Sequence, residues 1–325
     1  MKIVQLSMYD YGGSGYKYKQ AIERLNPNIE YTCVVSGISR ARMMFNFATG
    51  VMLTKENKEK VSHLIKEADV IHYKGDDLPT GTWGGITIPK KTPKIITVSG
   101  SGFRRGKSRV AFAWHPIEDY VKATDIRTAM TPDLNYPEFK GMYVPQAIDS
   151  LSQATTLTLT RCPYCKTRIP FTVTHSPSTG AKKGTDRFIL PALDRLKRTG
   201  TEFVLDMIEN TPHQECVERK KKASIFIDQV CETGAFGNSG LEAMQFGIPT
   251  IAGISQQSID QSDGLWDDLP VLNCSSKKDI YKTIKMYANE PELLREISTA
   301  TKQYVDKYHS YEAVGKMWEK ILQKL

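Results

Sequence analysis

The chain has 325 residues, of which 40% are hydrophobic and 25% charged, and its 44 Lys and Arg against 36 Asp and Glu give a net charge of +8. This composition excludes collagen, coiled coil and a mainly disordered chain. No apolar run approaches the roughly 18 residues of a membrane span, and the length of the chain predicts two domains. The basic charge favours anionic partners, namely nucleotides, nucleic acid or an anionic membrane face.

In the first half, predicted strands and helices alternate. The strand candidates are residues 2–6, 30–34, 69–73 and 94–98, and the helix candidates are the stretch around Ala21, Ile22 and Leu25 and residues 58–67. A glycine turn at residues 12–15 separates the first strand from the first helix, and Tyr143-Val144-Pro145 closes this half. Such alternation predicts a parallel sheet with helices on both faces.

Residues 147–169 are rich in Ser and Thr, and we interpret them as the crossing between domains. The alternation then restarts, with strands predicted at 171–174, 203–208, 224–228 and 249–253 and helices at 186–197, 214–222 and 240–246. Pro191 is expected to kink its helix, whereas Pro291 suits the first turn of another. The tail carries one apolar helical face, made of Val314, Met317, Trp318, Ile321, Leu322 and Leu325.

The six cysteines do not form a disulfide framework, and the short apolar start is not a signal peptide. We therefore expect a cytoplasmic protein, which would lie in the host cytoplasm if it is virus-encoded. Peripheral association with a membrane is an alternative that stays open. Cys162 and Cys165 form half of a zinc knuckle, but no second pair repeats the spacing, so we expect loop cysteines and no zinc.

The most informative stretch is "GAFGNSGLEAMQFGIPT", residues 234–250. It predicts a glycine-rich loop, a helix start and a strand, with Glu242 in the first turn of the helix. Small residues let backbone N–H groups approach an anion, and a carboxylate at this place can accept hydrogen bonds from ribose hydroxyls. An ordinary strand-to-helix turn with a capping glutamate explains the same letters about equally well.

The second stretch is "THSPSTGAKKGTD", residues 174–186. It predicts a strand end, a polar loop and a helix start. A lysine on such a loop can neutralise a pyrophosphate leaving group, and the alternative is a solvated loop lysine.

Together, these two stretches resemble the donor-binding half of GT-B glycosyltransferases, most closely the retaining glycosyltransferase family four. One branch of that family is also similar at "ASIFIDQV", "LPVL" and "YVDKYHSYEAVGKMWEKIL", and more weakly at "MYDYGGSG", "ADVIHYKG" and "VSGSGFRR" in the first half. The resemblance implies an α/β fold with two Rossmann-like domains facing each other across a cleft. It places an acceptor-side domain at 1–148, a nucleotide-sugar-binding domain at 149–310, and a helix at 311–325 that packs back on the first domain.

The resemblance also implies site residues. Lys183 matches the lysine that contacts the donor diphosphate, and Glu242 matches the carboxylate that holds the nucleotide ribose. The remaining donor-binding candidates are Gly12 and Gly13 of the first glycine loop, His175, and the loop residues Asn238, Ser239, Gly240 and Leu241.

Three positions depart from the family pattern. The acid that the family carries eight positions before Glu242 is Gly234 here, and the family arginine falls at Gly180, so Lys182 or Arg187 is expected to substitute. The family's first-domain histidine falls at Ser99. Ser99, the basic pair Arg104 and Arg105, and His115 as a candidate base remain acceptor-side candidates, although a charge run is also typical of a solvated face.

The activity implied is retaining transfer from a nucleotide-diphosphate sugar, with no metal or other cofactor required, to a glycan or a lipid-linked acceptor. Two alternatives stay open. The net charge of +8 favours a virus-type glycosyltransferase acting on modified bases of DNA, and the missing acid at Gly234 favours a non-catalytic nucleotide-sugar-binding protein.

Overall fold

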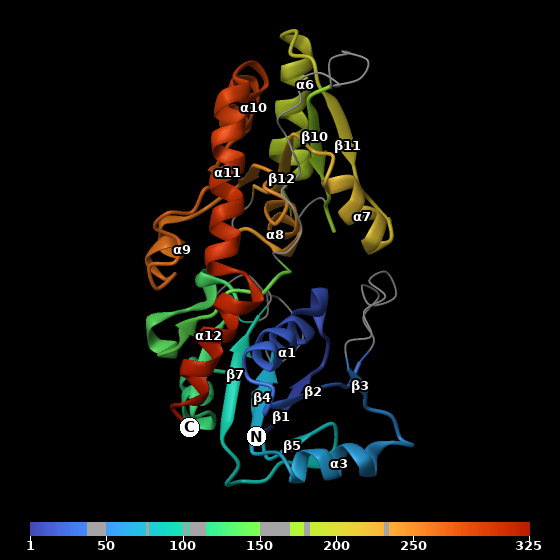
Figure 1. Cartoon of the computed structure of the whole chain (residues 1–325), viewed down its shortest axis with the longest axis vertical. Helices are drawn as coiled ribbons and strands as arrows, with labels where there is room; N and C mark the ends of the chain where they lie inside the picture. Colours follow the sequence, from blue (N-terminus) through green and yellow to red (C-terminus); the bar gives the residue numbers. More distant parts are fainter. Residues whose placement is uncertain are drawn as a thin grey trace. The chain divides into compact units, whose positions relative to one another are not determined.

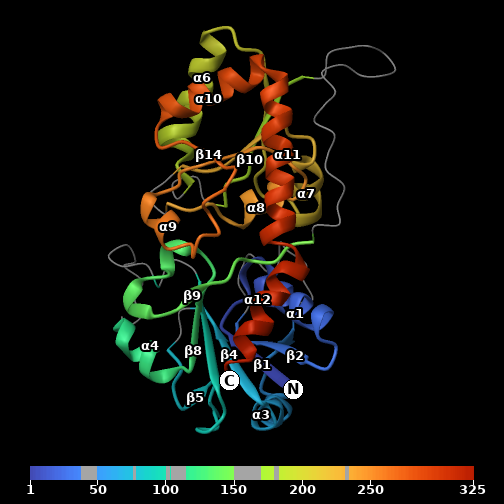
Figure 2. The ribbon, with the colours of Figure 1, turned by 60° about the vertical axis from the view of Figure 1, so that its left-hand side comes forward.

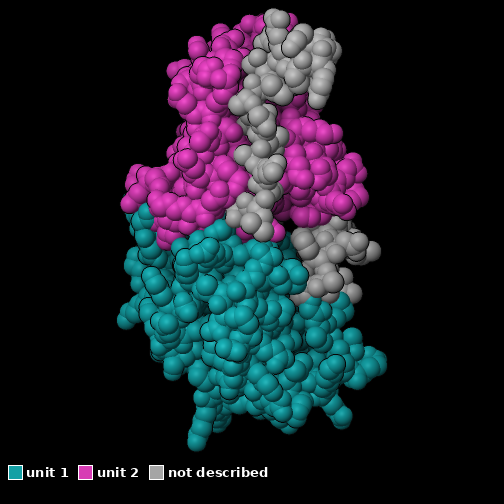
Figure 3. Space-filling model, viewed as in Figure 1, with its two compact units in different colours: residues 1–147, 260–264, 309–325 teal, residues 148–259, 265–308 magenta. Residues whose placement is uncertain are grey.

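The computed structural model describes residues 1–37, 50–75, 78–99, 103, 115–149, 170–178, 183–230 and 234–325, and Figures 1 and 2 show the ribbon from two sides. The chain divides into two compact units, coloured separately in Figure 3. The first unit comprises Met1–Ala147, Asp260–Gly264 and His309–Leu325, and the second comprises Ile148–Ile259 and Leu265–Tyr308. In the described part of the chain, no helix combines the length and apolar character needed to cross a membrane.

A parallel sheet forms the centre of the first unit, with its strands in the order β3-β2-β1-β4-β7-β8-β9. These strands are β1 (Lys2–Ser7), β2 (Glu30–Val35), β3 (Val51–Met52), β4 (Val70–Lys74), β7 (Lys94–Val98), β8 (Ile126–Ala129) and β9 (Met142–Tyr143). The strand order reverses beside β1, because β2 and β3 lie on one side of it and β4 and the later strands on the other. Doubly wound sheets bind ligands at the carboxyl ends of the strands at such a reversal.

Two helices from opposite ends of the sequence cover one face of this sheet. Helices α1 (Ser14–Leu25) and α12 (Tyr311–Leu322) lie side by side in Figures 1 and 2 and share an apolar cluster with the strands. Their backbones approach so closely at Gly315 that an added Cβ would lie 2.5 Å from the carbonyl oxygen of Ala21. Val314, Trp318 and Ile321 are buried here, so α12 is part of the first unit's core.

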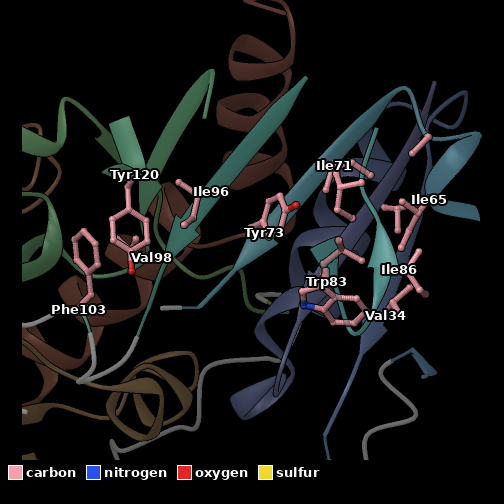
Figure 4. Packing of buried hydrophobic residues seen from close by; sticks show 14 of the residues in the cluster. Val34, Ile65, Ile71, Tyr73, Trp83, Ile86, Ile96, Val98, Phe103 and Tyr120 are labelled. Atoms are coloured by element: carbon pink, nitrogen blue, oxygen red, sulfur yellow. The ribbon is translucent and has the colours of Figure 1, made fainter. Parts of the chain in front are cut away.

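The other face is covered by α3 (Lys58–Lys66), α4 (Ile117–Ala123), and the antiparallel pair β5 (Thr82–Trp83) and β6 (Ile86–Thr87). Figure 4 shows Trp83, Val34 and Ile86 gathered at one end of this cluster and Phe103 against Tyr120 at the other. The alternation of strand side chains supplies both faces. Short helical turns η1 (Tyr11–Gly13), η2 (Pro132–Leu134) and η3 (Pro137–Phe139) complete the unit.

Hydrogen bonds hold two later stretches of the chain within the first unit: residues 260–264 and the segment that begins at His309. His309 begins the last stretch of this unit, is buried, and donates from Nδ1 to the Gln146 carbonyl oxygen at 2.9 Å. Asn135 donates to the Gln261 carbonyl oxygen, and the Tyr143 amide donates to the carboxylate of Asp263. Residues 260–264 are therefore fastened to the first unit, although their sequence neighbours belong to the second.

The second unit is built on another parallel sheet, in the order β11-β10-β12-β13-β14. Its strands are β10 (Thr172–His175), β11 (Val204–Met207), β12 (Ile225–Gln229), β13 (Thr250–Ala252) and β14 (Leu272–Asn273). Helices α6 (Leu190–Arg198) and α10 (Lys277–Asn289) pack on one face, while α7 (His213–Lys220) and α8 (Asn238–Met244) pack on the other. Helices α9 (Gln256–Asp260) and α11 (Pro291–Tyr308) complete the described elements. The order reverses between β10 and β12, which predicts a ligand site at their carboxyl ends.

The predicted helix at 186–197 is broken near Pro191. A π-helical segment, η4 (Thr185–Ile189), precedes α6, and Pro191 falls in the first turn of α6. Because a first-turn residue needs no intrahelical acceptor for its N–H, proline is tolerated there. The expected disturbance therefore takes the form of a change in helix type ahead of the proline.

Candidate functional site

The strand reversal of the second unit gathers polar groups from three separate stretches. Lys183 follows β10, while Asp228 and Gln229 end β12. The Lys183 ammonium donates to Asp228 Oδ1 at 2.9 Å and to Gln229 Oε1 at 2.7 Å. The Asp228 side chain is fully buried, whereas that of Lys183 keeps 13% of its surface exposed. A positive group with an accessible face therefore lies at the edge where this fold binds ligands.

The glycine loop lies directly against this ion pair. The Gly237 amide, at the start of α8, donates to Asp228 Oδ2. A Cβ on Gly237 would lie 3.2 Å from Lys183 Nζ, and one on Gly240 would lie 3.0 Å from the Asp228 carboxylate. A side chain at either place would require Lys183 or Asp228 to shift by a few tenths of an ångström, because the backbone approaches these charges closely. Asn238, Ser239, Gly240 and Leu241 form the first turn of α8 behind this contact.

Gly184 fixes the other side of the lysine loop. Its φ of +76° lies in the left-handed region, and a Cβ there would lie 2.1 Å from the Val230 carbonyl oxygen. The Val230 amide in turn donates to the Lys183 carbonyl oxygen at 3.0 Å. The lysine loop and the end of β12 are therefore held together by backbone as well as by side chains.

Glu242 lies one turn further along α8 and faces α7. Its two carboxylate oxygens pair with His213 Nε2 at 2.9 Å and with Lys220 Nζ at 2.7 Å. The Lys220 side chain is 1% exposed, and its ammonium also lies over the Phe226 ring, 5.3 Å from the centroid. The basic run that ends α7 thus contributes one buried lysine that orients Glu242. Because a helix rises about 1.5 Å per residue, Glu242 lies about 7.5 Å along the axis from Gly237.

His175 ends β10 beneath the lysine loop. Nδ1 lies 2.7 Å from the Ile227 carbonyl oxygen, so this nitrogen carries the proton, and Nε2 accepts from the Thr185 hydroxyl at 2.8 Å. Burial lowers the pKa of His175. The predicted donor-binding histidine is therefore engaged with its own unit through both nitrogens, and it supports the start of η4.

Gly234, at the position of the family's acid, has a left-handed backbone with φ of +67°. A Cβ there would lie 2.4 Å from Ser255 Oγ, and the Ser255 amide donates to the Gly234 carbonyl oxygen at 3.0 Å. The local conformation thus excludes an acidic side chain at this position, which accounts physically for the departure from the family pattern.

The first unit repeats the arrangement at its own strand reversal. Asp10 follows β1 and Lys74 ends β4, and their charged groups pair at 3.2 Å with both side chains 1% exposed. The Asp10 carboxylate also accepts from the amides of Gly15 and Tyr16 at the start of α1. Gly12 and Gly13 both have a φ of +63° and lead the chain into that helix. An internal carboxylate thus occupies the helix start that the sequence assigned to a ligand.

The acceptor-side candidates of the described chain are Ser99 and His115. Ser99 follows β7 at the carboxyl edge of the first sheet, and His115 is exposed with its ring edge-on to Tyr120, 6.4 Å between centroids. Arg187, a proposed substitute for the family arginine, is exposed and lies over the Phe188 ring. The other predicted residues, Lys182, Arg104, Arg105, Cys162 and Cys165, lie outside the described residues. Among those described, no cluster of three or more His, Cys, Asp or Glu could hold a metal ion.

Sequence reasoning missed Asp228, Gln229, Lys220, His213 and the pair Asp10–Lys74. Two signals were present: Asp228-Gln229 and Lys74 are polar residues that end otherwise apolar strands, and such ends meet at the ligand edge of a parallel sheet. Lys220 and His213 had no local signal, since both contact Glu242 from another helix.

Comparison with known proteins identifies the fold. No protein-family model and no curated protein matches the sequence. Among solved structures, an α-glucosyltransferase (AGT) in complex with UDP superposes with a TM-score of 0.63 at 11% identity, covering 99% of this chain and 100% of that one. Anabaena Alr3699/HepE in complex with UDP-glucose gives a TM-score of 0.64 at 12% identity, covering 100% of both chains.

A further α-glucosyltransferase complex contains UDP and a 13-mer DNA with an HMU base, and it gives a TM-score of 0.65 at 11% identity over 99% of both chains. The likeness extends over whole chains, so this chain has the GT-B fold of these glycosyltransferases, and the predicted α/β fold class is confirmed.

Proposed function

We propose that this chain is a glycosyltransferase whose second unit binds a nucleoside-diphosphate sugar. The observation that carries the proposal is that Lys183 and the Gly237 loop meet on Asp228 at the strand reversal of the second unit, with Glu242 further along the helix that this loop begins. A partly exposed ammonium suits a diphosphate, and a carboxylate one helical turn away suits ribose hydroxyls. The UDP and UDP-glucose held by the structurally similar proteins support a uridine nucleotide as the first donor to test.

In the proposed reaction, the bond between the sugar C1 and the diphosphate oxygen breaks, and its electron pair stays on the departing diphosphate. An acceptor hydroxyl oxygen forms the new bond to C1 and gives up its proton, for which His115 is the candidate base. Lys183 and the amides of residues 238–240, which start α8, meet the charge that develops on the leaving group, and this kind of stabilisation is usually the largest single contribution to catalysis. The resemblance to family four supports retention of the anomeric configuration without a metal.

The two predicted domains take separate roles in this proposal. Residues 149–310 bind the donor through Lys183 and Glu242, with Asn238, Ser239, Gly240, Leu241 and His175 shaping the pocket. Residues 1–148 supply the acceptor side through Ser99 and His115, with Gly12 and Gly13 at the start of α1, and residues 311–325 belong to its core.

The acceptor we propose first is a glycan or a lipid-linked glycan. One observation favours a second candidate, modified bases of DNA: the similar α-glucosyltransferase has been solved with DNA containing an HMU base, and this chain carries a net charge of +8. Electrostatic binding to duplex DNA falls steeply with salt, whereas binding to a neutral glycan does not. Peripheral contact with an anionic membrane would accompany the lipid-linked acceptor.

The donor is tested by thermal shift and by product release. We expect UDP to raise the Tm of the wild-type protein more than GDP, ADP or CMP, because a ligand bound only by the folded state stabilises it by mass action. With UDP-glucose and an acceptor, we expect UDP release that persists in EDTA. Lys183→Ala should lower this turnover roughly a hundredfold, as loss of a charge-stabilising donor does. Lys278→Ala, an exposed change on α10, is the matched control.

The outcomes separate the alternatives. UDP binding without UDP release, across glycan, lipid-linked and hydroxymethylated DNA acceptors, would leave a non-catalytic nucleotide-sugar-binding protein. Turnover with the DNA alone, and loss of DNA binding between low and moderate salt, would assign the second acceptor. NMR of the product anomeric proton tests retention.

Cytoplasmic location is part of the proposal. The described cysteines Cys33, Cys216 and Cys274 are buried free thiols, which is typical of a reducing compartment.

A further inference from the structure

Asp228 is a buried carboxylate that joins the two stretches of the candidate donor site. One of its oxygens accepts from Lys183 Nζ at 2.9 Å and the other accepts from the Gly237 amide. The side chain has no exposed surface, and Gly237 and Gly240 leave no room for a Cβ to separate it from the loop without displacement. The proposed function assigns the diphosphate to the first of these partners, Lys183, and to the amides that directly follow the second, Gly237.

We infer that Asp228 is a positioning residue for the donor site: it holds the Lys183 ammonium and the glycine loop at a fixed separation that suits the anionic leaving group. This inference rests on the proposed function and deepens it. An ammonium has three N–H donors, and within the described residues Lys183 uses two of them on Asp228 and Gln229. One N–H is then left for a phosphate oxygen, and the side chain keeps 13% of its surface exposed.

The comparison with the first unit shows why the second pair suits a ligand. Asp10 and Lys74 occupy the equivalent strand ends, but the Lys74 side chain is only 1% exposed. Its charge is turned inward, toward a carboxylate that already accepts from the start of α1. In the second unit the carboxylate is fully buried and the lysine side chain is 13% exposed, so the cation is the more accessible member of the pair.

The chemistry of the carboxylate predicts a particular pattern in variants. An asparagine at position 228 has one acceptor oxygen, so it can serve Lys183 or the Gly237 amide but not both. Conversely, a methionine at position 183 leaves Asp228 as an unpaired buried charge that repels an incoming diphosphate. Asp228→Asn should therefore harm UDP binding when Lys183 is present and improve it when Lys183 has been replaced.

The experiment is a double-mutant cycle on UDP affinity by isothermal titration calorimetry, with Asp228→Asn, Lys183→Met and the double variant. In the wild-type background, we expect Asp228→Asn to weaken UDP binding about threefold to tenfold. In the Lys183→Met background, we expect the same substitution to tighten UDP binding at least threefold, and to raise the Tm measured without ligand. Asp268→Asn, which removes the partner of Lys307 in an exposed pair on the same unit, should leave UDP affinity within twofold.

Each outcome decides the inference. Opposite signs in the two backgrounds support it, because only a residue that acts through Lys183 changes its effect when Lys183 is absent. If Asp228→Asn weakens UDP binding in both backgrounds, its role is generally structural, and if it tightens UDP binding in both, its effect is simple charge repulsion. If the two substitutions are additive within twofold, the residues are not coupled. Any of these results overturns the inference. Wild-type protein that binds none of UDP, GDP, ADP and CMP would instead refute the proposed function, and the inference with it.

Discussion

Replacing Lys220 by methionine tests the buried ion pair that holds Glu242. The Lys220 side chain is 1% exposed and that of Glu242 10% exposed, and their charged atoms lie 2.7 Å apart. Methionine keeps the length of the side chain but removes the ammonium, so Glu242 remains largely buried beside His213. Removing one member of a buried pair costs about 3–5 kcal/mol, because the other charge loses both water and its partner.

The adjacent lysine provides the control. Lys221 pairs with Glu218 at 2.6 Å, but these side chains are 37% and 58% exposed. An exposed pair contributes about 1 kcal/mol at most. For a domain of this size, each kcal/mol moves the Tm by about 2–4 °C, so we expect Lys220→Met to lower the Tm by about 6–20 °C and Lys221→Met by less than about 4 °C.

Thermal unfolding followed by circular dichroism measures both variants. Adding Glu242→Gln to Lys220→Met should recover part of the lost Tm, since no unpaired charge then stays buried. Equal shifts for Lys220→Met and Lys221→Met would refute the reasoning, because burial would then make no difference to the two pairs.

Further predictions concern the first unit and the dependence on pH. Gly315→Ala should destabilise the protein by about 1–3 kcal/mol, since its Cβ would lie 2.5 Å from a backbone oxygen of α1. The control is Gly81→Ala, which should change the Tm little because nothing lies within 4 Å of the new Cβ. Similar Tm values for the two variants would contradict the close packing of α1 and α12. Burial lowers the pKa of His309 from 6.5 to about 4, so the folded state binds this proton less readily than the unfolded state. The stabilising contribution is therefore complete above pH 6.5 and is lost as the pH falls toward 4, by about 3 kcal/mol in total. His309→Asn keeps a donor for the Gln146 carbonyl and should flatten the fall of Tm between pH 6.5 and 4; an unchanged slope would exclude His309 as its source.

The periodicity of the sequence predicted the repeating elements well, and for a simple reason. The strands at 2–6, 30–34 and 94–98 are short apolar runs bounded by turn residues, and the structure has Lys2–Ser7, Glu30–Val35 and Lys94–Val98. The apolar face predicted for the helix at residues 314–325 was also largely right, because Val314, Trp318 and Ile321 are buried, although Leu325 is exposed. Strand β8 was missed, since Ile126–Ala129 is four residues long and contains Arg127.

The candidate site was predictable only where its residues follow one another. Lys183 and the loop before Glu242 could be found because they belong to continuous stretches, and the structure places them at one sheet edge. The partners of these residues come from elsewhere in the chain: Asp228 from another strand, Lys220 from another helix. Nothing local distinguishes Lys220 from Lys221, because burial against Phe226 and Glu242 depends on how α7 and α8 pack.

The division into units is interleaved along the chain, since Asp260–Gly264 and His309–Leu325 belong to the first unit while the stretches around them belong to the second. A gene cut after residue 147 would therefore not produce a self-sufficient half. The amino-terminal fragment would expose the apolar side of α1 where Val314, Trp318 and Ile321 normally pack, and it would be prone to aggregation. Because residues 309–325 complete the core of the first unit and follow the second unit in the chain, the first unit can finish folding only after the ribosome has made the second unit.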